Sequence, residues 1–185
     1  MKPVPLEDWP DRIDSLVEQI GPPLKVGRVI AECDSTQEPA SAMGIGSLVV
    51  TGRQVAGRGQ RGNAWADTGA DGLAFSLVLP ATTRPDGSRA IAVAIVEGLK
   101  PLVDATVKEP NDVLLEGRKL AGVLIEQSGG QAVIGIGINV LQAEWPAELE
   151  GIAISLHQAG CMLDRIEVLE YVLPGLVEAW NRYTG

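Results

Sequence analysis

Glycine and arginine alternate in the stretch VAGRGQRGNAW, residues 55–65, and residues of these types could bind an anion. Three of the glycines match the G-x-G-x-x-G pattern of dinucleotide-binding loops. That pattern needs a helix that opens within the motif, but the following residues, NAWADTGADG, include two glycines and two aspartates, which disfavour a helix. A phosphate-binding P-loop would need G-K-[ST] at its end, which is absent. Two interpretations remain: a surface loop anchored by Trp65, or a loop in which Arg58 and Arg61 bind carboxylate or phosphate oxygens.

Two later segments also carry residues that could act on an anion. The segment KEPNDVLLEGRKLAGVLIE, residues 108–126, places Lys119 on an expected strand shortly before Gly122. The segment GIGINV, residues 135–140, ends an expected strand with Asn139 after two glycines. A lysine in such a place is either a surface residue on a hairpin or a cation that binds a ligand, and its own sequence context leaves both readings open.

The elements that must position these residues follow from the apolar periodicity and the turn residues. Helices are expected over residues 6–20, 34–43, 86–105, 153–160 and 164–183. Asp8 is the expected N-cap of the first helix and Ser88 that of the helix over 86–105, which should end near Pro101. A kink or interruption is expected at Pro174 in the last helix. Strands are expected over residues 24–32, 46–54, 72–80, 105–110, 113–128 with a break at Glu116-Gly117, and 131–140. Because hairpin turns join the later strands and strict β-α-β alternation is absent, we predict an α+β fold with a mixed, largely antiparallel sheet flanked by helices.

Composition excludes several classes of protein. The 185 residues carry a net charge of −9, which argues against DNA or a membrane surface as the main partner. No apolar run has the ~18–20 residues of a membrane span, and no secretory signal is visible. Cys33 and Cys161 lie far apart in the sequence without the spacing of metal ligands, and the single His157 cannot form a histidine cluster, so a structural zinc site or a disulfide framework is not expected. We therefore expect a cytoplasmic protein.

Five segments together resemble the catalytic domain of biotin–protein ligases, in the biotin/lipoate ligase superfamily. They are CDSTQ (33–37), GRGQRGNAW (57–65), KEPND (108–112), RKLAGVLIE (118–126) and GIGIN (135–139), which match the family signatures in order. The resemblance implies a fold like that of class II aminoacyl-tRNA synthetases. It also implies a two-step reaction, in which biotin and MgATP give biotinyl-5′-adenylate and pyrophosphate. A lysine of a biotin carboxyl carrier domain then accepts the biotinyl group.

By this resemblance, each site residue has an expected role. The resemblance assigns biotin binding to Ser35, Thr36, Gln37, Gln54, Gly57, Arg58, Trp65, Lys119 and Gly122. It assigns ATP binding to Arg58, Arg61, Trp65, Lys108, Asn111, Arg118 and Asn139, and catalysis to Lys119, Arg58, Arg61 and Asp112. Lys119 would neutralise the biotin carboxylate and the α-phosphate, and Asp112 would accept the proton of the incoming lysine. No metal-ligating residues are assigned, although Mg²⁺ is expected with ATP.

The sequence also departs from the family pattern. Gln60 and Asn63 replace two arginines of the loop, Glu109 replaces a tryptophan, and Gln37 replaces the asparagine that usually follows D-S-T. We expect a single catalytic domain over residues 1–185, without the family's N-terminal helix-turn-helix and without its small C-terminal β-barrel domain. A homodimer is one alternative for the oligomeric state.

Two other functions stay open beside the biotin–protein ligase. One is a related ligase or transferase that uses lipoate, octanoate or another carboxylic acid. The other is a catalytically silent module that binds biotin or a nucleotide, which the departures at Gln60, Asn63 and Glu109 would suit.

Overall fold

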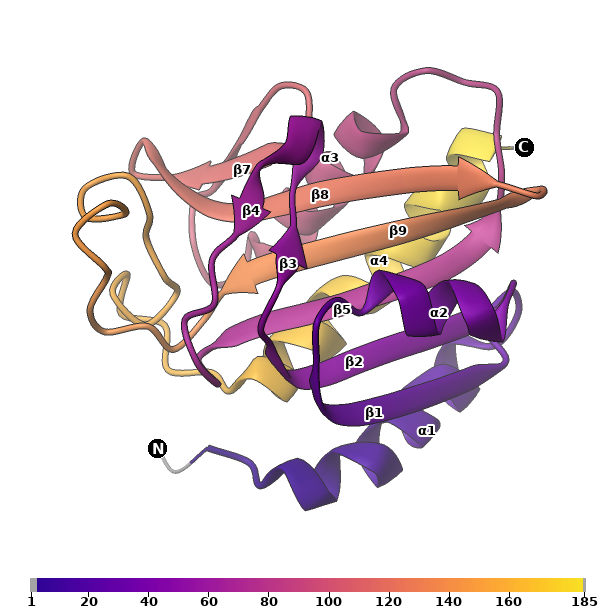
Figure 1. Ribbon diagram of the computed structural model, residues 1–185, viewed down its shortest axis with the longest axis horizontal. Coiled ribbons are helices and arrows are strands. Elements are labelled where there is room, and N and C mark those ends of the chain that lie inside the picture. The colour runs from indigo at the N-terminus through magenta and orange to yellow at the C-terminus, as the bar shows by residue number, and fades with distance from the viewer. Residues whose placement is uncertain (1–2, 185) are drawn as a thin grey trace.

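The protein, described by a computed structural model for residues 3–184, is built on a seven-stranded sheet (Figure 1). The helices are the 3₁₀ turn η1 (Leu6–Asp8), α1 (Trp9–Ile20), α2 (Gln37–Met43), the 3₁₀ turn η2 (Gln60–Gly62), α3 (Gly87–Leu99) and α4 (Arg165–Thr184). The strands are β1 (Val26–Cys33), β2 (Ser47–Gln54), β3 (Gly57–Arg58), β4 (Ala64–Trp65), β5 (Gly72–Pro80), β6 (Thr106–Lys108), β7 (Asp112–Leu115), β8 (Arg118–Ser128) and β9 (Gln131–Asn139).

The sheet has the strand order β1-β2-β5-β9-β8-β7-β6. Only β1 and β2 pair in parallel, and every other neighbouring pair is antiparallel. The predicted hairpin between β7 and β8 turns at Glu116 and Gly117, whose φ angles of 53° and 75° suit a two-residue hairpin turn. The prediction of an α+β fold with a mixed, largely antiparallel sheet is therefore confirmed.

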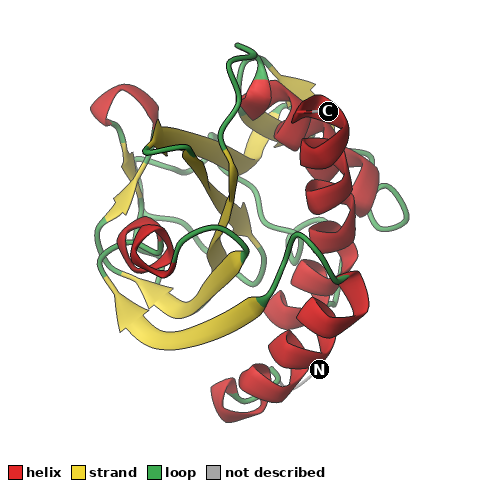
Figure 2. Cartoon of the chain, turned by 90° about the vertical axis from the view of Figure 1, so that its right-hand side faces the viewer, coloured by secondary structure: helices red, strands yellow, loops and turns green. Residues whose placement is uncertain are grey.

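The two faces of the sheet are covered differently (Figure 2). Helices α1, α3 and α4 lie on one face, where side chains such as Leu48, Val50 and Phe75 join the main hydrophobic core. The short helix α2 lies on the other face, over a smaller cluster to which Val49 and Val78 belong. Successive residues of one strand thus serve opposite faces, as the period of a strand requires. The face that α2 covers only in part is open for a ligand.

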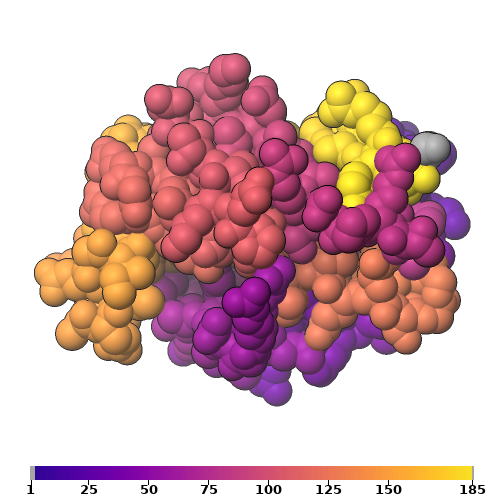
Figure 3. All heavy atoms as spheres, turned by 90° about the horizontal axis from the view of Figure 1, so that it is seen from above, coloured from indigo at the N-terminus to yellow at the C-terminus, as the bar shows by residue number. Residues whose placement is uncertain are grey.

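A small ribbon, made of β3, η2 and β4, leaves the sheet between β2 and β5. Its two strands pair with each other and cross over β9 and β8 in Figure 1, while β2 and β5, which precede and follow the ribbon, pair in the sheet with Val50 opposite Phe75. Seen from above, the purple tip of the ribbon lies beside the coral atoms of the segment that follows α3 (Figure 3). The ribbon is therefore an insertion between β2 and β5, which both belong to the seven-stranded sheet.

A buried arginine at the start of α4 forms hydrogen bonds to both strands that the ribbon connects, β2 and β5. Arg165 donates from Nη1 to the carbonyl oxygens of Gly52, at 2.6 Å, and Gly72, at 3.2 Å. Its guanidinium lies 4.7 Å from the ring centroid of Trp9, a cation–π contact with α1. Burial lowers the pKa of Arg165. The first and last helices are thus tied to the strands that carry the ribbon.

Three local expectations need correction. Residues 153–160 do not form a helix, because Ala153 forms a bridge beside Lys119 in β8 and the chain then turns, with Ser155 Oγ accepting from Gln158 N. Helix α3 begins at Gly87 and has Asp86 rather than Ser88 at its N-cap position. Helix α4 continues through Pro174 as one helix. Asp8 occupies the N-cap position of α1 as expected, but its side chain makes no capping hydrogen bond.

Within residues 3–184, no helix combines the length and the apolar character that a membrane-spanning helix needs.

Candidate functional site

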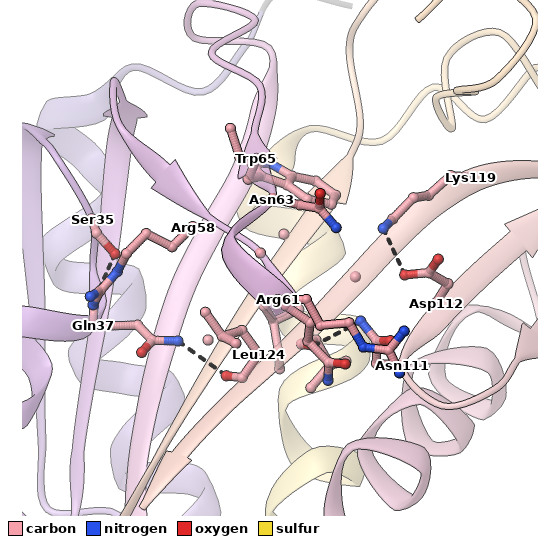
Figure 4. A pocket seen from close by; sticks show the side chains of 18 of the residues that line it. Ser35, Gln37, Arg58, Arg61, Asn63, Trp65, Asn111, Asp112, Lys119 and Leu124 are labelled. Carbon is pink, nitrogen blue, oxygen red and sulfur yellow. Dashed lines mark hydrogen bonds and ion pairs between the residues drawn. The ribbon is translucent and has the colours of Figure 1, made fainter.

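A cavity of about 260 Å³ opens between α2, the ribbon and strands β7 to β9 (Figure 4). Most of the residues that the sequence singled out line it, although they come from four separate segments. These are Ser35, Thr36, Gln37, Gln54, Arg58, Arg61, Trp65, Asn111, Asp112, Lys119 and Gly122. The fold therefore brings together most of the residues that the resemblance assigned to one site.

Lys119 and Asp112 form an ion pair on neighbouring strands of this cavity. Their Nζ and Oδ1 atoms lie 2.6 Å apart, and Figure 4 shows the two side chains pointing toward each other. The ammonium also lies 5.6 Å from the ring centroid of Trp65. About a third of the Lys119 side chain stays exposed, so an anion that enters the cavity can reach its charge. Asn139 lies behind it and donates from Nδ2 to the carbonyl oxygen of Lys119, at 3.1 Å.

Glycines on β8 and β9 form the floor on which the large side chains rest. A β-carbon on Gly137 would lie 2.5 Å from Cε2 of Trp65, and one on Gly122 would lie 3.0 Å from its Cζ3. Real β-carbons essentially never come as close as the first distance, and the second is tighter than nine in ten real contacts. The absence of side chains at Gly122 and Gly137 thus lets the Trp65 indole lie flat against the sheet as one wall of the cavity.

The opposite end of the cavity is polar and buried. The Thr36 backbone N–H donates to Oε1 of Gln54, at 3.0 Å, and the hydroxyl of Thr36 lies 2.7 Å from that of Ser76. Ser35, Thr36 and Gln37 are each more than nine-tenths buried. Such an end offers a few fixed donors and acceptors, which suits a neutral polar ring better than a charge. The sequence analysis missed Ser76, whose signal is a single hydroxyl inside the apolar strand GLAFSLVLP.

The ribbon carries its two arginines at the mouth of the cavity. Nη2 of Arg58 lies 3.4 Å from Oε2 of Glu126 and 3.8 Å from Oε1 of Glu38. Arg61 has a φ of 58°, a left-handed conformation that few residues other than glycine adopt, and it turns the chain at the tip. Both guanidiniums are on a short, partly exposed element, so they can shift toward an anion.

A charged pair clamps the base of the ribbon. Arg53, at the end of β2, donates from Nε and Nη2 to the two carboxylate oxygens of Asp67, at 3.1 and 2.6 Å. The hydrogen bonds from Arg53, followed by one from the backbone of Gly69, lower the pKa of Asp67. The clamp joins the ribbon's return segment to the sheet outside the cavity.

Four assigned residues do not line the cavity. Lys108 is exposed on β6, and Arg118 pairs with Glu116 on the hairpin turn, at 2.7 Å. Asn139 lies behind Lys119, and Gly57 lies beneath Gln54 and Trp65.

Glu109, which replaces the family's tryptophan, does line the cavity. Its Oε1 lies 2.8 Å from Nε of Arg89 in α3, at an exposed position, so its charge is paired. Asn111, next to it, donates from Nδ2 to the carbonyl oxygen of Val123, at 3.2 Å.

The described residues bring no three His, Cys, Asp or Glu side chains together as a metal site. Mg²⁺ commonly binds through substrate phosphates with few protein ligands.

The chain is similar to known proteins in sequence and in fold. Residues 27–142 match the model of the "Biotin/lipoate A/B protein ligase family". The chain is 37% identical over 142 residues to the bifunctional ligase/repressor BirA of Bacillus subtilis, covering 69% of this chain and 44% of that protein. It is 34% identical over 171 residues to a biotin--[acetyl-CoA-carboxylase] ligase of Paracoccus denitrificans, covering 79% of this chain and 69% of that protein.

A solved structure is similar over most of the chain. The biotin protein ligase from Aquifex aeolicus, in complex with biotin and ATP, superimposes with a TM-score of 0.79 at 32% identity, covering 87% of this chain and 72% of that one. The chain spans about half the length of the Bacillus relative. On the match of sequence and fold, this chain belongs to the biotin/lipoate A/B protein ligase family.

Proposed function

We propose that this chain is an ATP-dependent biotin–protein ligase, with its activity in a single catalytic domain over residues 1–185. It would activate biotin as biotinyl-5′-adenylate and transfer the biotinyl group to a lysine of a biotin carboxyl carrier domain. The observation that carries the proposal is the Lys119–Asp112 pair, which lies beside Trp65 in a cavity with one polar buried end. The relatives named for biotin ligation support biotin over lipoate or octanoate as the acid.

The polar end suits the ring of biotin. Hydroxyls of Ser35 and Thr36, with the amide of Gln54, would form hydrogen bonds to the ureido group. The indole of Trp65 would cover the apolar part of the acid, and the glycine floor would let the acid lie close to the strands. The carboxylate would then point toward Lys119.

The first step brings two anions together. A carboxylate oxygen of biotin attacks the α-phosphorus of MgATP, the bond to the β-phosphate oxygen breaks, and pyrophosphate leaves. The ammonium of Lys119 would bind the carboxylate and the α-phosphate, and Arg58 and Arg61 would move from the mouth onto the phosphate oxygens. Lys108 and Arg118 would contribute a positive field from the rim rather than direct contact, because they lie outside the cavity wall.

The second step transfers the acyl group. The free amine of the carrier lysine attacks the acyl carbon, the bond to the phosphate oxygen breaks, and AMP leaves. Asp112 would accept the proton that the amine releases, since its carboxylate lies on the wall of the cavity.

Both cysteines are free, which agrees with the reducing cytoplasm that we propose as the compartment.

Pyrophosphate release tests this function. The protein would be incubated with MgATP and biotin, with lipoate or octanoate in parallel, and with Lys119→Ala as the variant. Release that depends on biotin and is lost in Lys119→Ala is the expected result. Release with lipoate or octanoate alone would favour the related acyl ligases. No release with any acid, together with biotin binding by calorimetry, would favour a silent binding module.

A further inference from the structure

A second hollow lies on the far side of Gln37 from the proposed biotin cavity. It has a volume of about 300 Å³. Apart from Gln37 and Arg58, which line both spaces, its residues are Glu38, Ser41, Glu126, Ser128, Gln131 and Val133. The side chains of Gln37 and Arg58 are therefore the shared wall between the two spaces.

Gln37 is the buried part of that wall. Only 5% of the residue is exposed, whereas 43% of the Arg58 side chain is. From the first turn of α2, its side chain crosses over Gly135 in β9 and donates from Nε2 to the carbonyl oxygen of Leu124 in β8, at 3.1 Å. Gly135 and Leu124 are paired across the two strands, so the amide spans one complete step of the sheet. Figure 4 shows this bridge at the end of the cavity opposite Lys119.

Shape, more than hydrogen bonding, holds Gln37 in place. Its Oε1 is buried and has no hydrogen-bond partner, and an unpaired buried acceptor is unfavourable. Gly135 leaves no room for a β-carbon beneath the amide, so the side chain fills the gap between α2 and the sheet. Removing it would join the two spaces.

We propose that Gln37 is the specificity-determining wall of the cavity, which excludes acids with a substituent on the ring end. This inference rests on the proposed function, since it places the ring of biotin beside Gln37. In Gln37→Ala, a substituent on the ring would pass through the gap into the second hollow. The variant would then bind ring-substituted biotins that the unchanged protein rejects.

Calorimetric titration with biotin and with its two mono-N-benzyl ureido derivatives tests the inference on the full chain. The unchanged protein should bind biotin and reject both derivatives. Gln37→Ala should bind at least one derivative at least about tenfold more tightly than the unchanged protein does, a change of about 1.4 kcal/mol. Gln37→Leu keeps the bulk but loses the amide, so it should still reject both.

Gln131→Ala is the matched control. Gln131 lines only the second hollow and donates from Nε2 to Ser41 Oγ, at 2.9 Å, so its truncation enlarges that hollow without opening the wall. It should reject both derivatives as the unchanged protein does. Rejection of both by a folded Gln37→Ala variant that still binds biotin would overturn the inference, as would binding of a derivative by Gln37→Leu. If the unchanged protein does not bind biotin, the proposed function itself has failed, which is a separate result.

Discussion

Gly137→Ala is the sharpest test of the glycine floor. The new β-carbon would lie 2.5 Å from Cε2 and 2.6 Å from Cζ2 of Trp65, where ordinary contact begins at 3.4 Å. The indole must therefore move by about 0.9 Å, the difference between the observed and the ordinary distance. Overpacking in a rigid core would cost about 1–3 kcal/mol of unfolding free energy. Trp65 is only partly buried on the ribbon, so its indole can move away from the new β-carbon at a lower cost. Replacing a glycine within a strand by alanine also stabilises the folded state by about 0.5–1 kcal/mol.

Stability and activity should separate in this variant. We expect the free energy of unfolding to change by no more than about 1 kcal/mol, because the two effects nearly cancel. We expect kcat/KM for biotin-dependent pyrophosphate release to fall by about 100-fold, because a displacement of about 1 Å moves the wall that positions the acid. Urea unfolding measures the first quantity and steady-state kinetics the second. Trp65→Phe should then cost less activity in the Gly137→Ala background than alone, since the two residues are in contact.

A methyl group added elsewhere serves as the control. Gly175 lies in α4, and a β-carbon there would come no closer than 3.9 Å to Ala94 O. Gly175→Ala should therefore raise stability by up to about 1 kcal/mol and leave the kinetics unchanged. If Gly137→Ala keeps kcat/KM within about twofold of the unchanged protein, the floor does not set the position of the indole and the reasoning is wrong.

Three further predictions concern the charged residues. Asp112→Asn should slow transfer to a carrier domain in single turnovers by about 100-fold or more, and slow adenylate formation less, because only the transfer needs a proton acceptor. The hydrogen bonds from Arg53 lower the pKa of Asp67. The stabilising effect of this ion pair is therefore present above the usual carboxyl pKa of about 3.9, and it is lost as the pH falls through the lowered pKa of Asp67. An NMR titration of Asp67 should give a midpoint below the usual carboxyl pKa. The protein should release biotinyl-adenylate and thereby label an unrelated lysine-rich protein. The double variant Gln60→Arg with Asn63→Arg should reduce that labelling, because the added guanidiniums bind the adenylate. Labelling of the carrier domain alone by the unchanged protein would contradict this prediction.

Much of the fold could be predicted from local patterns. Strand β5 is bounded by Gly72 and Pro80 as expected, and the Glu116-Gly117 turn separates two strands because both residues can adopt positive φ. The 153–160 segment could not be predicted, because its conformation depends on the bridge between Ala153 and Lys119, which lie far apart in sequence. Local propensity carries no information about such a contact.

The order of the motifs singled out most of the residues that line the cavity, but it did not predict their geometry. The sequence put Lys119 and Asp112 in adjoining segments, yet their 2.6 Å pairing depends on the register between β7 and β8, which has an irregularity at Val113. The departure at Glu109 was unexplained by the sequence because its partner, Arg89, lies on a helix 20 positions away. Contacts of this kind arise only when the sheet edge and α3 meet.

The ribbon connects two strands, β2 and β5, that pair with each other in the sheet without it. Arg165 and the Arg53–Asp67 pair fix the strands at the base of the ribbon, while β3 and β4 pair with each other and not with the seven-stranded sheet. The ribbon can therefore open as a local unit while the sheet stays intact, and its amide hydrogens should exchange much sooner than those of β5 or β9. Substitutions in the ribbon that leave the sheet unchanged should therefore change the rate at which a ligand leaves the cavity more than they change the free energy of unfolding.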